Sequence, residues 1–284
     1  MSAAMNAFSY VLETLDRARK IDENAPGATR RELQRTYLKL RAKYKLRRVL
    51  PASALRGESI CGFRLECFDF GTLVFLFEEI FLRRDYEFAA ATNRPLIFDC
   101  GSNIGMALIF FKCLYPEARV VAFEPCRESF DLLTRNVEAN RLGGVELHNV
   151  ALNRSESPVE FFVNDAHPAS LTNSTKAGQV AGTPRVVQGV PLSKFVTEPL
   201  DFMKMDIEGS EAGVLEELAE SGRIRMIREM VVEYHHHVDR RADSLSRTLR
   251  LLEDCGFGYQ IRSVPWQAFT RETFQDVLIR AYKK

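Results

Sequence analysis

A net charge of one sign, long apolar runs and a secretion signal are all missing from this sequence of 284 residues. Its 39 Lys and Arg nearly balance its 38 Asp and Glu, so the net charge of +1 favours neither a nucleic acid nor a membrane as partner. The N-terminus lacks the basic-then-apolar pattern of a signal peptide. No apolar run approaches the roughly 20 residues that cross a bilayer. We therefore expect a cytoplasmic protein without a transmembrane segment.

The six cysteines are not spaced for a zinc site or a disulfide framework. No Cys-x-x-Cys pair occurs, and no cysteine stands at a histidine spacing typical of zinc. Cys100, Cys113 and Cys126 lie in apolar or motif segments, which favours buried, reduced thiols. With 46% hydrophobic and 27% charged residues, the chain has the composition of an ordinary globular protein with a large core.

Residues 1–57 are predicted to form a helical extension ahead of a main domain at 58–284. Apolar residues recur at helical spacing on both sides of a breaker at residues 24–27. The second helical stretch, 30–48, is strongly basic and contains a single acid, Glu32. Its charge indicates either a solvated helix face or a docking surface for an anionic partner, such as a carrier protein or a membrane surface.

Beyond a short hairpin and an apolar helix between residues 58 and 88, short apolar segments alternate with helical ones. The expected strands are Leu96–Cys100, Arg119–Phe123, Val145–Val150, Phe202–Ile207 and Met230–Tyr234. The expected helices are Ile104–Tyr115, Glu128–Asn140, Ala212–Ser221 and Ser244–Cys255. This alternation predicts an α/β fold with a mostly parallel sheet that helices cover on both faces.

Two segments depart from the alternation. The strands expected at Tyr259–Ser263 and Asp276–Tyr282 have no helix between them, which predicts an antiparallel hairpin at the C-terminal edge of the sheet. Residues 157–195 contain two further strand patterns around a polar stretch rich in Gly, Ser and Thr. We interpret them as an inserted hairpin with a mobile loop.

The strongest motif is a glycine-rich turn between the strand that ends at Cys100 and the following helix. It reads D-x-G-x-N-x-G, with Asp99, Gly101, Asn103 and Gly105 at the named positions. Glycines let a backbone approach a ligand closely, and the helix N-terminus that follows can bind an anionic group. A nucleotide pyrophosphate would be repelled by the acid ahead of the glycines, whereas the ammonium of an amino-acid moiety suits it. The motif therefore favours S-adenosylmethionine over a nicotinamide dinucleotide.

A second acid ends the next strand. Glu124, followed by Pro125, lies roughly 20 residues past the glycine turn, where Rossmann-type sites place the acid that binds ribose hydroxyls. A surface glutamate at a strand end is the alternative. The spacing from the glycine turn favours the ribose role.

These motifs, together with Asn149-Val-Ala151-Leu and Met203-Lys-Met-Asp206-Ile-Glu208-Gly-Ser-Glu211, resemble the pattern of FkbM-type methyltransferases. The resemblance covers about three quarters of the chain and excludes the first fifty residues. It implies a Rossmann-like class I methyltransferase sheet and S-adenosylmethionine as cofactor. The cofactor-site residues that it implies are Glu79, Tyr86, Asp99, Gly101, Ser102, Asn103, Gly105, Glu124, Pro125, Asn149 and Ala151. Position 102 is usually Ala in the family and position 126 usually Asp, so Cys126 would weaken adenine or ribose contacts.

Acids gather again at the end of the fourth expected strand. Lys204, Asp206 and Glu208 should share one side of that strand, at the sheet edge where ligands bind. Glu211 alone is explained by its place at a helix N-terminus. We predict that Asp206 and Glu208 orient or deprotonate the methyl acceptor.

Histidines follow the fifth expected strand. Glu233 and His235 should face alike, and His235 is a candidate general base near neutral pH. His236 and His237 are as compatible with a polar loop as with a site. No metal site is expected, because His235 and His237 lie too close in sequence to make a convincing pair with Asp206. His167 and Ser170, in the inserted segment, could touch the acceptor.

The sequence therefore predicts an S-adenosylmethionine-dependent enzyme that methylates a hydroxyl group on a sugar or another small molecule of natural-product biosynthesis. One alternative is an inactive cofactor-binding or docking protein that works through the basic helix at 30–48. A nicotinamide dehydrogenase and a nucleic-acid methyltransferase are further alternatives, and neither has its expected motifs. No nucleic-acid partner is expected, and a homo-oligomer is compatible with the sequence.

Overall fold

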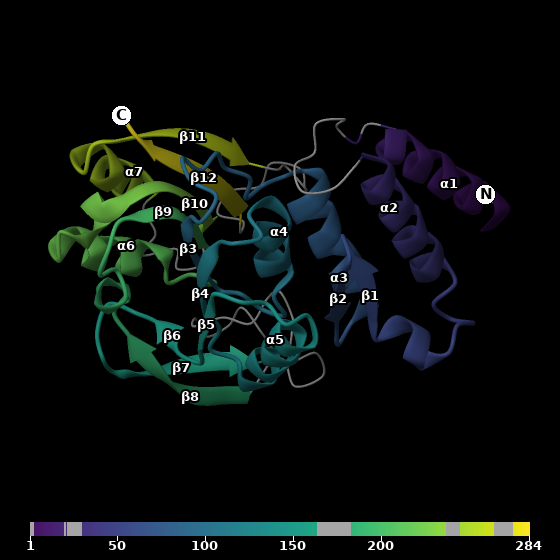
Figure 1. Ribbon diagram of the computed structural model, residues 1–284, viewed down its shortest axis with the longest axis horizontal. Helices are drawn as coiled ribbons and strands as arrows, with labels where there is room; N and C mark the ends of the chain where they lie inside the picture. Colours follow the sequence, from purple (N-terminus) through teal and green to yellow (C-terminus); the bar gives the residue numbers. More distant parts are fainter. Residues whose placement is uncertain (1–2, 20, 22–29, 164–182, 237–244, 264–274) are drawn as a thin grey trace.

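The computed structural model describes residues 3–19, 21, 30–163, 183–236, 245–263 and 275–284 (Figure 1). The breaker at 24–27 and the polar stretch of the inserted segment, 164–182, lie outside these ranges. Their predicted conformations stay predictions.

A seven-stranded sheet forms the centre of the molecule (Figure 1). Its strands are β3 (Leu96–Cys100), β4 (Arg119–Phe123), β5 (Val145–His148), β9 (Leu200–Met205), β10 (Ile227–His236), β11 (Phe257–Ser263) and β12 (Gln275–Lys283). Their order is β11-β12-β10-β9-β3-β4-β5, and β12 runs antiparallel to both its neighbours. The predicted mostly parallel sheet with an antiparallel C-terminal hairpin is confirmed.

Helices cover both faces of this sheet because successive side chains of its strands enter different hydrophobic clusters. Ile97 and Phe202 pack in the cluster of α4 (Met106–Leu114) and α5 (Arg127–Ala139). Phe98 and Met203, one residue further along each strand, pack in the cluster of α6 (Glu211–Glu220) and α7 (Leu245–Asp254). This two-sided burial explains the unbroken apolar character of the strands.

Two strands end earlier than predicted, whereas β10 continues to His236, past the predicted Tyr234. The third expected strand ends at His148 rather than Val150, and the fourth ends at Met205 rather than Ile207. After Met205 the chain turns, and Glu208 and Gly209 have φ angles of 55° and 101°. Asp206 and Glu208 therefore lie in a turn, and the strand alternation used to place them on one side does not extend to them.

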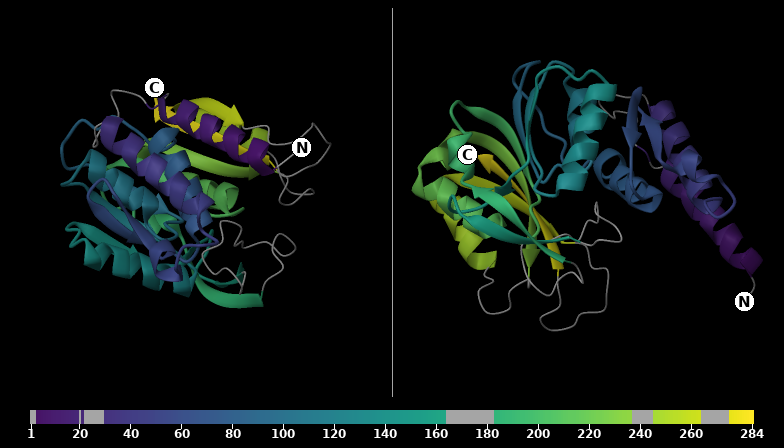
Figure 2. Two further views of the ribbon diagram at one scale, coloured as in Figure 1. Left: turned by 90° about the vertical axis from the view of Figure 1, so that its right-hand side faces the viewer. Right: turned by 90° about the horizontal axis from the view of Figure 1, so that it is seen from below.

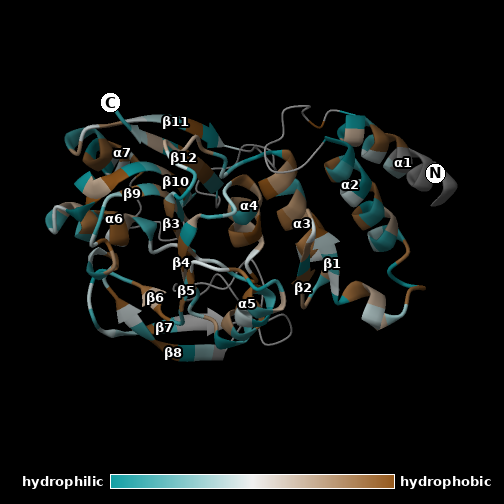
Figure 3. Cartoon of the chain, viewed as in Figure 1, coloured by the Kyte–Doolittle hydropathy of each residue, from teal (hydrophilic) through white to brown (hydrophobic). Residues whose placement is uncertain are grey.

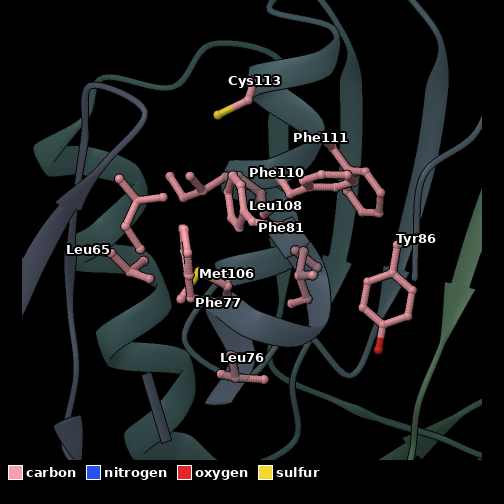
Figure 4. Close-up of a cluster of buried hydrophobic side chains, with 14 of the residues drawn as sticks. Leu65, Leu76, Phe77, Phe81, Tyr86, Met106, Leu108, Phe110, Phe111 and Cys113 are labelled. Carbon is pink, nitrogen blue, oxygen red and sulfur yellow. The ribbon is translucent and has the colours of Figure 1, made fainter. Parts of the chain in front are cut away.

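The N-terminal part consists of α1 (Ala3–Arg19), α2 (Arg30–Lys45), η1 (Ala52–Leu55), the hairpin β1 (Gly57–Ile60) and β2 (Phe63–Glu66), α3 (Phe70–Phe77) and η2 (Glu78–Leu82). It lies at one end of the molecule, beside α4 (Figure 2). Figure 4 shows Leu65, Phe77 and Phe81 packed against α4 side chains such as Phe110. Leu33, Tyr37 and Leu40 of the predicted extension belong to the same hydrophobic cluster, which also includes side chains of the sheet, and the domain boundary at residue 57 stays a prediction.

The inserted segment contributes two strands to a second, small sheet. The order of strands in this sheet is β6 (Ala151–Leu152), β8 (Thr183–Val190) and β7 (Pro158–Val163), and β6 precedes the inserted segment in the chain. Strands β7 and β8 pair antiparallel, as the predicted hairpin requires. The single turns η3 (Leu192–Lys194) and η4 (Arg223–Met226) complete the described elements.

Helix α2 is hydrophilic over most of its length, apart from a buried stripe of Leu33, Tyr37 and Leu40 (Figure 3). Part of its charge is used within the chain, because Lys39 and Lys43 both donate hydrogen bonds to the carboxylate of Glu58. An anionic partner for the remaining basic face stays a prediction. Within the ranges that the structure describes, no helix has both the length and the apolar character to cross a membrane.

Replacing the buried acid Glu58 should reveal how much its hydrogen bonds with Lys39 and Lys43 stabilise the fold. Burial alone would raise the pKa of Glu58, but hydrogen bonds from Lys39, the Ser59 N–H and Lys43 hold the pKa below its ordinary value of 4.5. Because hydrogen bonds to charged groups contribute about 1.5–3 kcal/mol, we expect Glu58→Gln to lower the unfolding free energy at pH 7 by that amount. Urea unfolding measures it.

The same effect should depend on pH. Because the pKa of Glu58 is lower in the folded state than in the unfolded state, the ionised side chain stabilises the fold above pH 4.5. This stabilisation is lost as the pH falls through the folded-state pKa. The difference between wild type and Glu58→Gln should therefore shrink below pH 4.5. The exposed Glu66 serves as control, and Glu66→Gln should have little effect. A difference for Glu58→Gln that does not change with pH would contradict this account.

Candidate functional site

A cavity opens at the carboxyl ends of β3, β4 and β9. Strands β4 and β5 lie on one side of β3, and β9 and β10 on the other, so the strand order reverses at this point. In open α/β sheets, ligands bind at such reversal points. The cavity is lined by Leu76, Ile80, Tyr86, Gly101, Ser102, Asn103, Met106, Ala107, Phe123, Glu124, Pro125, Val150, Ala151, Leu152, Lys204, Asp206, Ile207 and Glu208.

The glycine turn forms the floor of the cavity. Gly101 has a φ of 84°, and a Cβ atom there would lie 1.8 Å from the main-chain oxygen of Asp206. The Asp206 N–H donates a hydrogen bond of 3.0 Å to the Cys100 oxygen, which holds the two turns together. Gly105, with a φ of 93°, precedes the first turn of α4. Gly101 is therefore required by close packing of two strand-end turns as well as by its backbone conformation.

Glu124 connects the ends of β3 and β4. Its carboxylate accepts hydrogen bonds from the Asn103 N–H (2.8 Å) and the Cys126 N–H (2.9 Å), while the side chain lines the cavity. Burial raises the pKa of Glu124 to about 7, although both hydrogen bonds act in the opposite direction. The residue thus shapes the wall by holding two turns, and its binding of a ribose stays a proposal.

Lys204 neutralises the acid of the glycine motif. The carboxylate of Asp99 is fully buried behind the cavity wall, with one oxygen 3.7 Å from the Lys204 ammonium. Lys204 itself is 3% exposed, donates a 2.6 Å hydrogen bond to the Gly101 oxygen and lies 3.3 Å from Asp206. Asp99 does not line the cavity, so its expected effect on a ligand becomes an indirect one, through Lys204 and the turn.

Some of the other expected cofactor residues line the cavity, and others lie behind its wall. Ser102, Pro125, Ala151 and Tyr86 line the cavity together with Asn103.

Asn149 lies behind the wall. Its amide donates hydrogen bonds to the main-chain oxygens of Glu124 (2.8 Å) and Pro125 (3.1 Å), and it lines an adjoining hollow next to Cys126. Glu79 also stands back from the cavity and pairs with Arg83. Burial and the nearby charge of Asp206 raise the pKa of Glu79 to about 7, although Arg83 lowers it.

The turn after β9 and the end of β10 bring the three expected catalytic residues together. Nε2 of His235 lies 3.3 Å from a carboxylate oxygen of Glu208 and 3.8 Å from one of Asp206. On its other side, Nδ1 of His235 lies 2.8 Å from Glu211. Glu233 faces the same side as His235, as strand alternation predicts, and accepts a 3.3 Å hydrogen bond from the Tyr86 hydroxyl.

Glu211 has a larger role than its place at a helix N-terminus indicated. It is 1% exposed, and its carboxylate accepts hydrogen bonds from the N–H groups of Ile207 and Gly209 while it holds His235. The spacing Asp206-x-Glu208-x-x-Glu211 is visible in the sequence, but only the fold reveals that the Glu211 side chain points inward.

Burial and charge set the protonation states of this cluster. Burial alone would lower the pKa of His235, but Glu211, Glu208 and Asp206 raise it well above its ordinary value. Burial raises the pKa of Glu233 to about 8 and raises that of Glu208 well above its ordinary value. The expected role of His235 as a general base stays a prediction.

The apolar part of the cavity wall was not expected from the sequence. Leu76 and Ile80, from α3 and η2, and Met106, at the start of α4, line the cavity. The apolar run at 70–82 indicated a buried helix but not that it borders the site. His237, His167 and Ser170 lie outside the described residues, so nothing tests their expected roles.

Comparisons with known proteins show which proteins this chain is similar to. A family model described as "Methyltransferase FkbM domain" matches residues 99–259. "Methyltransferase 1" of Beauveria bassiana is 27% identical over 216 residues, covering 68% of this chain and 84% of that protein. The "31-O-demethyl-FK506 methyltransferase FkbM" of Streptomyces tacrolimicus is 28% identical, covering 66% and 82%. The crystal structure of "Methyltransferase FkbM" from Methylobacillus flagellatus has a TM-score of 0.44 at 16% identity, covering 98% of this chain and 60% of that one.

A matched pair of glycine substitutions tests the close approach at Gly101. Gly62 has nearly the same φ, 82°, but a Cβ there would meet no atom within 4 Å. Gly62→Ala should therefore cost only the left-handed backbone strain, about 1–2 kcal/mol. Gly101→Ala should cost about 1–3 kcal/mol more, because its methyl group overpacks the turn against Asp206. Equal losses of unfolding free energy in the two variants would contradict the packing described here.

Proposed function

This chain belongs to the FkbM methyltransferase family, and we propose that it transfers a methyl group from S-adenosylmethionine to a hydroxyl oxygen of a sugar or another natural-product small molecule. The single observation that carries the proposal is the cavity itself. A glycine turn, a strand-end glutamate and a cluster of acids converge on one hollow at the reversal of strand order.

The residues of the cavity fit this cofactor. Gly101 lets the glycine turn pack directly against the Asp206 main chain, and the main chain of this turn lines the cavity where an amino-acid moiety would lie. Gly101, Ser102 and Asn103 would hold that moiety beside the start of α4. Glu124 and Pro125 would hold the ribose.

At the far end of the cavity, Ala151 would border the adenine and Tyr86 would close the wall. Asp99, Asn149 and Glu79 would act from behind the wall, by keeping these residues in place.

When bound, the cofactor supplies an electrophilic methyl group: a C–O bond forms to the acceptor, the C–S bond breaks with its electron pair going to sulfur, and the hydroxyl proton goes to a base. The chain's task is to align the hydroxyl and to receive that proton. Asp206 and Glu208 line the cavity and are proposed to accept hydrogen bonds from the hydroxyl, with Glu208 as the base. His235, 3.3 Å from Glu208, would position that carboxylate.

Oxygen as the acceptor atom has support from a relative. The Streptomyces tacrolimicus relative is named for 31-O-demethyl-FK506, a compound that lacks a methyl group on an oxygen. An acidic edge also suits an acceptor whose hydroxyl must lose a proton, because the carboxylates are proton acceptors placed beside the cavity.

Cofactor binding can be tested at Glu124. Glu124→Gln keeps the shape of the side chain but removes its charge, and hydrogen bonds to charged groups contribute about 1.5–3 kcal/mol. We expect the affinity for S-adenosylhomocysteine, measured by calorimetry, to fall by about ten- to a hundred-fold. Glu138→Gln makes the same chemical change at an exposed position near the end of α5, and as the control it should bind as wild type does. Unchanged affinity in Glu124→Gln would rule out the ribose role, and binding of NAD alone would rule out the methyltransferase function.

Methyl transfer can be tested separately at Glu208. Wild type would be incubated with S-adenosylmethionine labelled in its methyl group and a panel of sugars, uronic acids and macrolides. Label should appear on an oxygen of at least one acceptor. Glu208→Gln should keep its affinity for S-adenosylhomocysteine and turn over about 10²–10⁴ times more slowly, as expected for a lost general base. Label on nitrogen, or an unchanged rate in Glu208→Gln, would contradict the assignment.

A further inference from the structure

Five carboxylates meet at the edge of the cavity where β9 and β10 end. Asp206, Glu208 and Glu211 belong to the turn after β9 and the start of α6, whereas Glu233 lies on β10 and Asp276 on β12. They surround His235, and the Lys204 ammonium lies 3.3 Å from Asp206. Carboxylate oxygens grouped around one imidazole nitrogen are a donor set that can hold a cation.

The donor atoms around His235 have the spacing of a metal site. Its Nε2 atom lies 3.3 Å from Glu208, 3.8 Å from Asp206 and 3.9 Å from Asp276. Two ligands of one Mg²⁺-sized ion, each about 2.1 Å from it, lie about 3–4 Å apart. Ligand atoms of Asp206, Glu208 and His235 all lie within 4.8 Å of one another, and so do those of Glu233, His235 and Asp276.

The histidine is also held as metal-binding histidines are. Glu211 fixes Nδ1 at 2.8 Å, which directs Nε2 toward the three carboxylates. Glu211 is in turn fixed by main-chain N–H groups, so the ring orientation is set from behind. A carboxylate behind the ring is a recurrent arrangement around metal-binding histidines.

An independent observation comes from the neighbouring strand. Oδ1 of Asp276 is buried, although the side chain as a whole is 41% exposed, and this oxygen accepts no hydrogen bond from the part of the chain that the structure describes. Buried carboxylate oxygens nearly always have a partner, so this one is available as a ligand donor. It points to the same space as Nε2 of His235, 3.9 Å away.

We propose that Asp206, Glu208 and His235, with Asp276 as a fourth donor, bind a divalent cation of the Mn²⁺ or Mg²⁺ type beside the cavity. Carboxylate ligands suit Mg²⁺ and Mn²⁺, and Mn²⁺ also accepts an imidazole. This revises the expectation of no metal site, which considered the adjacent histidines with Asp206 but not Glu208 and Asp276. The role of the cation rests on the proposed function: it would hold the acceptor hydroxyl and lower its pKa.

The test titrates MnCl₂ alone into the full chain, freed of metal with EDTA and dialysed. Free Mn²⁺ is measured by electron paramagnetic resonance, and the heat of binding by calorimetry. We expect one Mn²⁺ per chain, and at least ten-fold weaker binding in Glu208→Gln and in Asp276→Asn. Glu220→Gln makes the same chemical change as Glu208→Gln at an exposed position on α6 and should bind as wild type does. Circular dichroism checks that each variant is folded.

The outcomes separate this inference from the proposed function. S-adenosylhomocysteine binding is measured on the same metal-free samples. If it binds and Mn²⁺ does not, or if Glu208→Gln and Asp276→Asn both keep the wild-type affinity for Mn²⁺, the metal site is wrong and the proposed function stands. If Mn²⁺ binds as expected and S-adenosylhomocysteine does not bind, the metal site stands and the proposed function is wrong.

Discussion

The buried ammonium of Lys204 is the contact on which the rest of the site depends. It lies between the carboxylates of Asp99 and Asp206 and donates a hydrogen bond to the Gly101 oxygen, so it joins the ends of β3 and β9 under the cavity. Asp99 is completely enclosed, and an uncompensated charge there would be costly. The attraction of two acids therefore raises the pKa of Lys204 above its ordinary value, even though burial opposes this. The glycine turn keeps its position because the charge of Lys204 is paired with Asp99 and Asp206 of the same chain.

From that centre the site divides into two halves of different chemistry. On the β4 side, main-chain groups and Glu124 form a wall whose carboxylate is already occupied by two N–H groups. On the β10 side, several carboxylates lie close together around His235, and burial raises the pKa values of Glu208 and Glu233. The first half is suited to hold a ligand by shape and hydrogen bonds. The second is suited to accept a proton or a cation.

Parts of the chain outside residues 99–259, which match the family model, complete this site. Leu76, Ile80 and Tyr86 close the cavity from the N-terminal side, and Asp276 reaches the acidic edge from the last strand. Leu76, Ile80 and Tyr86 are held in place by the hydrophobic cluster that α3, η2 and α4 share. In this cluster the rings of Phe77 and Phe81 stack with their centroids 5.2 Å apart. Packing of the N-terminal segment and the shape of the cavity are therefore coupled.

The sequence by itself determined the sheet, the glycine turn and the acids at strand ends, because apolar periodicity and turn residues act locally. β3 and β4 have the predicted ends, and Asp206, Glu208 and His235 meet as expected. Only the tertiary structure decided which acids face inward. Glu211 is the partner of His235 and not merely a charge at a helix end. Asp99 lies behind the cavity wall, beside Lys204, and Asp276 of β12 lies beside His235. Burial and long-range neighbours set pKa values and contacts, and neither can be read from local spacing.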